Sequence, residues 1–148
     1  LAQSRVSDVM GGPKASTYVW TTICAALGYK TLRDDLSPWP LIAVWTLNGI
    51  QQHFMRDQCL EMYGCNKQSA LGNAMMGVSG QSMLMGAAYL IALTKGKSQA
   101  EAFGISWAVG AALAAKFCVT EADDLKVPKA GPGVWAVISA GIAYACLK

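Results

Sequence analysis

The chain has 148 residues, of which 53% are hydrophobic and 14% are charged, and its formal net charge is +3. Because an average soluble protein is about 25% charged, this composition argues against an ordinary soluble domain. The basic residues are scattered, and no basic cluster alternates with aromatic residues. This distribution of charge excludes a nucleic-acid-binding surface.

Charged residues are absent from three long stretches of the chain. The runs 36–55, 68–94 and 130–147 contain 20, 27 and 18 residues without Asp, Glu, Lys or Arg. A helix of roughly 20 such residues crosses the hydrocarbon core of a bilayer, which is about 30 Å thick. We therefore expect an all-α, multi-pass transmembrane helical protein of four to five helices with short loops. A compact soluble bundle with unusually apolar helices is the alternative.

Five apolar segments follow one another in what we expect to be a single transmembrane domain over residues 1–148. The first segment is short, and it spans a membrane only if the lysines at its two ends reach toward the headgroups. The fourth is marginal because a charged residue lies near each of its ends. A connector rich in Pro, Gly and charge precedes the fifth. The segments lie near 16–32, 38–55, 69–94, 99–118 and 132–148.

Small residues are frequent in the last three segments. Many of them stand four positions apart, such as Gly104 and Ala108 or Gly110 and Ala114. This spacing lets the backbones of two membrane helices approach closely. We therefore expect these helices to pack against protein more than against lipid.

The sequence motifs of common enzymes and metal sites are missing. There is one histidine, His53, and there is no HExxH, Walker A or GxGxxG motif and no CxxC pair. We predict no catalytic residues, no metal site built from protein side chains alone, and therefore no enzyme. Cys59 and Cys65 share one polar loop, where they form either a local disulfide or two free thiols.

The polar groups that remain in the apolar segments are amides, one imidazole and one carboxylate. Intramembrane Asn and Gln commonly join helices through hydrogen bonds. The functional alternative is axial ligation of a chlorophyll, because its magnesium accepts an imidazole nitrogen, an amide oxygen or a carboxylate. The candidate cofactor-binding residues are His53, Asn48, Gln52, Asn73, Gln81 and Glu101.

These features predict a non-catalytic accessory subunit of a photosystem or antenna complex, with chlorophyll as its candidate cofactor. The chain begins LAQSRVSD, without a methionine, and we expect it to have lost a targeting segment. The expected location is an organellar membrane, the thylakoid in preference to the mitochondrial inner membrane. The expected partners are other subunits of a large membrane complex, lipid and pigments.

Two other functions remain open. One is a supernumerary subunit of a mitochondrial respiratory complex, which needs no pigment and uses the amides only to join helices. The other is a small-solute membrane carrier. In the third apolar segment a polar path for a solute would be lined by Asn73, Gly77, Gly80 and Gln81.

Overall fold

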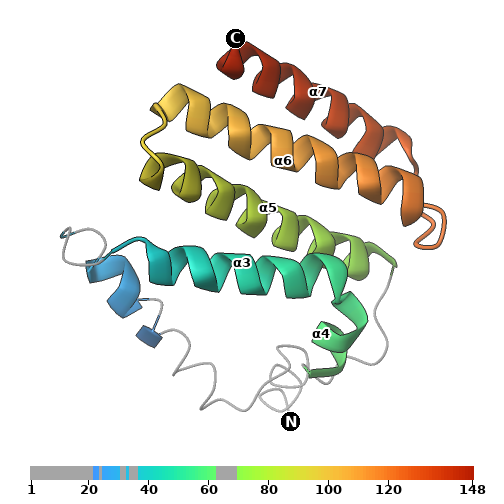
Figure 1. Cartoon of the computed structure of the whole chain (residues 1–148). Helices are drawn as coiled ribbons and strands as arrows, with labels where there is room; N and C mark the ends of the chain where they lie inside the picture. Colours follow the sequence, from blue (N-terminus) through green and yellow to red (C-terminus); the bar gives the residue numbers. More distant parts are fainter. Residues whose placement is uncertain (1–21, 24, 31–32, 34–36, 63–69) are drawn as a thin grey trace.

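The computed structural model describes residues 22–23, 25–30, 33, 37–62 and 70–148. These residues contain helices and turns and no β-strand, which confirms the all-α expectation for the described part of the chain. About half of the predicted segment 16–32 lies outside it, and residues 22–23 and 25–30 of that segment are helical. The five helices that carry labels in Figure 1 are α3 (Trp39–Phe54), α4 (Arg56–Met62), α5 (Ala70–Thr94), α6 (Gln99–Thr120) and α7 (Ala130–Leu147).

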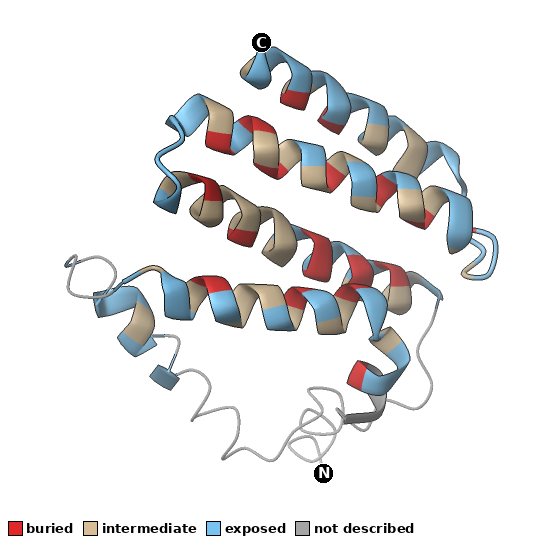
Figure 2. Cartoon of the chain, in the orientation of Figure 1, coloured by how far each residue is buried: buried red, intermediate tan, exposed pale blue. Residues whose placement is uncertain are grey.

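Four of these helices lie side by side in the order α3, α5, α6, α7, and the short α4 turns away from the end of α3 (Figure 1). The main contacts between them are those of α3 with α5, α5 with α6 and α6 with α7. Buried residues therefore lie along the faces that neighbouring helices share, as Figure 2 shows. The outermost helix α7 buries only Ser139 and Ala143.

Three of the helices are long and apolar enough to cross a membrane, namely residues Gly72–Thr94 of α5, all of α6 and all of α7. Helix α3 has 16 residues. At 1.5 Å per residue it is about 24 Å long, which is shorter than a hydrocarbon core of about 30 Å. Prolines at its start and the break at Met55 set this length. The expectation of four to five spanning helices is therefore not confirmed.

The turn between α5 and α6 is tight because each helix has a well-formed cap. Gly96 adopts a φ of 77°, a conformation that favours glycine, and the amide of Lys97 donates to the carbonyl of Ala92 at 3.1 Å. Ser98 and Glu101 then form a capping box at the start of α6. These two caps hold α5 and α6 as an antiparallel pair.

The backbones of α3 and α5 approach most closely at two glycines. A Cβ atom added to Gly80 would lie 2.7 Å from the backbone nitrogen of His53 and 2.8 Å from the carbonyl oxygen of Gly49. A Cβ added to Gly49 would lie 3.0 Å from the carbonyl oxygen of Gly80. Only glycine at these two positions allows this contact, because backbone atoms cannot move aside as the end of a flexible side chain can.

We expect Gly80→Ala to destabilise the protein by about 1–3 kcal/mol, the typical cost of overpacking, because the new methyl group meets backbone atoms of α3. Gly141→Ala is the matched control, since nothing lies within 4 Å of a Cβ added there. Alanine is favoured over glycine in a helix by about 1 kcal/mol, so this control should raise the melting temperature. Circular dichroism in detergent measures both changes, and equal melting temperatures would contradict the packing described for α3 and α5.

Candidate functional site

His53 is held in the contact between α3 and α5. Its side chain is 1% exposed, and its Nδ1 atom lies 2.9 Å from the carbonyl oxygen of Gly77. A carbonyl oxygen only accepts hydrogen bonds, so Nδ1 must carry the hydrogen. In the neutral ring Nε2 then carries a free electron pair, and this buried atom has no hydrogen-bond partner. One nitrogen of the imidazole therefore has no partner, and a ligand could reach this buried atom only if neighbouring side chains moved aside.

An apolar groove of about 370 Å³ lies beside His53. Its walls come from α5, from the second half of α6 and from the start of α7. Phe117 and Trp135 contribute aromatic rings, and Met75 contributes a thioether. Gln81 also lines the groove, and its Nε2 atom donates to the carbonyl of Gly110 on α6 at 3.0 Å. His53 and Gln81 are the two predicted ligands that the structure brings together.

The other four candidate residues lie elsewhere. Asn48 is half-buried and donates to the carbonyl of Val44, in its own helix, at 2.9 Å. Gln52 is half-buried on α3. Asn73 lines a different pocket, and its buried Oδ1 atom has no partner. Glu101 belongs to the cap of α6 and pairs with Lys97 at 3.0 Å. The six residues therefore do not form one site.

Three side chains join neighbouring helices through backbone carbonyls. His53 bonds from α3 to α5, and Gln81 bonds from α5 to α6. Ser106 donates in the opposite direction, from α6 to the carbonyl of Met85 on α5, at 2.9 Å. The role of Ser106 could not be predicted from the sequence. Serine is common, and its partner is a backbone carbonyl, a group that every residue has. These bonds are the interhelical contacts that intramembrane polar residues commonly make.

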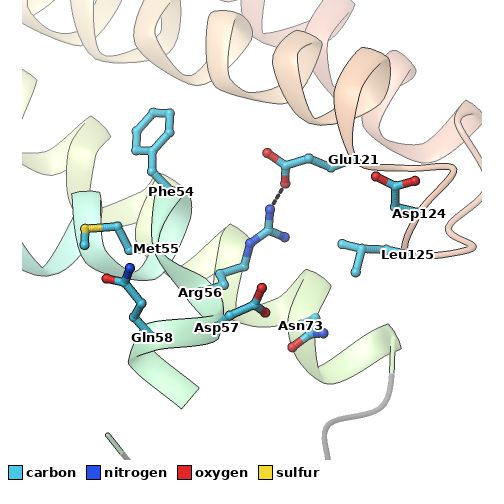
Figure 3. A pocket seen from close by; sticks show the side chains of 9 residues that line it. All are labelled: Phe54, Met55, Arg56, Asp57, Gln58, Asn73, Glu121, Asp124 and Leu125. Atoms are coloured by element: carbon cyan, nitrogen blue, oxygen red, sulfur yellow. Dashed lines mark ion pairs between the residues drawn. The ribbon is translucent and has the colours of Figure 1, made fainter. Parts of the chain in front are cut away.

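A second, polar pocket of about 320 Å³ lies where α3, α4, α5 and the end of α6 meet (Figure 3). Glu121 forms ion pairs with both Arg56 and Lys116, and Arg56 and Glu121 point toward each other across the pocket. Arg56 also lies 5.6 Å from the ring centroid of Phe117. In the sequence, Glu121 lies in the connector between the fourth and fifth apolar segments. The cluster could not be recognised there because its members are far apart along the chain.

Cysteine and metal chemistry are limited in the described residues. Cys59 is buried and free, and burial raises the pKa of its thiol. Cys65, with which Cys59 would form a disulfide in one of the two alternatives, lies outside the described part of the chain. Among the residues that the structure describes, there is no group of three His, Cys, Asp or Glu side chains that could hold a metal ion.

We expect Glu121→Ala to destabilise the protein by about 3 kcal/mol, because it leaves the largely buried Arg56 and the charge of Lys116 without their carboxylate. Asp123→Ala is the matched control from the same loop. Asp123 pairs with the exposed Lys129 at 2.6 Å, and such surface pairs contribute little. Thermal unfolding in detergent compares the two variants. A similar small loss in both would show that the cluster does not stabilise the fold.

Comparison with known proteins finds no matching family model, no matching curated protein and no matching solved structure. The contacts around His53 and in the polar pocket are therefore the basis on which a function can be proposed.

Proposed function

We propose that this chain is a non-catalytic accessory subunit of a photosystem or antenna complex in the thylakoid membrane, and that His53 is an axial ligand of a chlorophyll. The observation that carries this proposal is the hydrogen bonding of His53. Its Nδ1 atom donates to the carbonyl of Gly77, its buried Nε2 atom has no partner, and the residue lines an apolar groove. Metal-ligating histidines typically donate their other ring N–H to a carbonyl or carboxylate in this way.

The residues of the groove are compatible with a chlorophyll. When bound, a chlorophyll supplies a light-absorbing macrocycle whose magnesium accepts one further ligand from the protein. His53 would provide that ligand, and the Gly77 carbonyl would hold the imidazole in one tautomer and orientation. Phe117 and Trp135 would give the macrocycle apolar contacts. Because the His53 side chain is 1% exposed, a ligand would reach it only through this groove.

The accessory role is supported by how the buried polar groups are used. His53, Gln81 and Ser106 each bond to a carbonyl of a neighbouring helix. Three helices have the length and composition of membrane spans, and many of their apolar side chains are exposed in the single chain. Exposed apolar side chains on a membrane helix are available to lipid or to neighbouring subunits.

A pigment-free subunit of a respiratory complex is the second candidate, and the same three interhelical bonds favour it. In that case the imidazole of His53 serves only to join α3 to α5. The carrier receives less support. Gly80, on the expected solute path, is packed against the backbone of α3, and Gly77 is close to Arg56. Gln81 and Asn73 line two different pockets, so the residues of the expected path do not line one continuous path.

The first test is an absorption spectrum of the detergent-solubilised particle that contains this chain. We expect red-region chlorophyll bands that co-purify with it. A particle without pigment, or with haem bands only, would contradict chlorophyll binding and favour the respiratory alternative.

We expect His53→Leu to remove one chlorophyll per chain, because leucine offers no nitrogen to the magnesium. Ser106→Ala is the matched control, because it also removes one interhelical hydrogen bond but its side chain does not line the groove. The control should keep its pigment. Pigment extraction with absorbance quantification, normalised to protein, measures both. Equal pigment content in the two variants would remove His53 from the site.

A further inference from the structure

We propose that the polar pocket around Arg56, Asn73 and Glu121 binds a phosphate ester that carries a primary ammonium group, the headgroup chemistry of phosphatidylethanolamine. This inference rests on a membrane location, as the proposed function does, but not on the thylakoid in particular. It does not depend on pigment binding, because the pocket shares no lining residue with the groove at His53.

The pocket contains both a hydrogen-bond donor and an acceptor that lack partners. The Nη1 atom of Arg56 and the Oδ1 atom of Asn73 are both buried and make no hydrogen bond. Leaving such atoms unpaired costs free energy, so the two side chains would gain by turning toward a molecule in the pocket that satisfies both. Its acceptor must face Arg56 and its donor must face Asn73. A phosphate oxygen and an ammonium N–H meet these two requirements.

The charges of the pocket select a zwitterion over an anion. Arg56 is the one cationic residue that lines it, and its guanidinium is already paired with Glu121. Asp57 and Asp124 are exposed at the pocket and add two further carboxylates. A purely anionic headgroup would be repelled by these carboxylates, whereas an ammonium group would be attracted to them.

The position of the pocket fits a lipid better than a small soluble molecule. It lies beyond the end of α3, near the start of α5 and at the end of α6, where spanning helices would leave the hydrocarbon core. Phe54 and Met55 also line it, and their side chains are 51% and 43% exposed. This apolar edge would contact the acyl chains while the polar residues hold the headgroup.

The test measures the melting temperature of the full chain in detergent after addition of defined lipids at equal mole fraction. We expect the largest stabilisation from phosphatidylethanolamine. Its apparent affinity should be about tenfold higher than that of phosphatidylglycerol, because its ammonium group can form two surface ion pairs with the carboxylates of the pocket. Phosphatidylcholine has the same charges but no N–H donor, so it should bind more weakly than phosphatidylethanolamine. Equal stabilisation by all three lipids would overturn the proposal, because the pocket would then not distinguish one headgroup from another.

Substitutions in the polar pocket test which residues are responsible for the lipid preferences. Asn73→Ala should abolish the preference for phosphatidylethanolamine over phosphatidylcholine. Asn48→Ala is the matched control, since that half-buried amide bonds only within its own helix, and it should keep the preference. The double variant Asp57→Asn with Asp124→Asn should lose the discrimination against phosphatidylglycerol. Preferences that persist in both Asn73→Ala and the double variant would place the lipid elsewhere and overturn the proposal.

Two further measurements distinguish a failure of the lipid site from a failure of the membrane location. If soluble phosphoethanolamine stabilises the chain as strongly as the lipid, the headgroup chemistry is supported and the lipid source is overturned. If the chain stays monomeric in buffer without detergent, the membrane location fails, and with it both the lipid site and the proposed function. If the chain needs detergent and shows no headgroup dependence, only the lipid site fails.

Discussion

The close approach of α3 and α5 at Gly49 and Gly80 is the contact on which both candidate sites depend. It brings the end of α3 near enough to α5 for the imidazole of His53 to bond to the carbonyl of Gly77. The chain leaves α3 directly after this point, and Arg56 is therefore positioned to reach Glu121 at the end of α6. A larger side chain at either glycine would separate the helices, and it would displace both the groove and the polar pocket.

The helices could be predicted largely from the sequence, and the sites only in part. Uncharged runs identify α3, α5 and α7 because membrane-length helices exclude charge, whereas α6 was predicted from its apolar residues although it contains Glu101 and Lys116. The predicted boundaries of these four helices differ from the observed ones by at most two residues. The failure of α3 to reach spanning length was not predicted. The uncharged run includes residues before Trp39 and the non-helical Met55, so the run is longer than the helix.

The hydrogen-bond partners of the polar side chains could not be predicted from the sequence, for a physical reason. His53, Gln81 and Ser106 all bond to main-chain carbonyls, and every residue has one, so no residue type marks the acceptor. The Arg56–Glu121 pair joins residues of α4 and the loop after α6, and only the packed fold shows that they meet. Candidate ligands could be named by their chemistry, but grouping them required the three-dimensional arrangement.

The difference in length between α3 and its neighbours has a mechanical consequence. In a bilayer, a 16-residue helix beside helices of 22 and 25 residues creates a hydrophobic mismatch along one edge of the helix layer. The membrane next to α3 would have to become thinner by about 6 Å, or a neighbouring subunit would have to fill the missing thickness. The edge formed by α7, which has 18 residues and is about 27 Å long, has about half of that mismatch. The two edges of the layer would thus differ in elastic energy, so thinner lipid or a neighbouring protein would be favoured beside α3 more than beside α7.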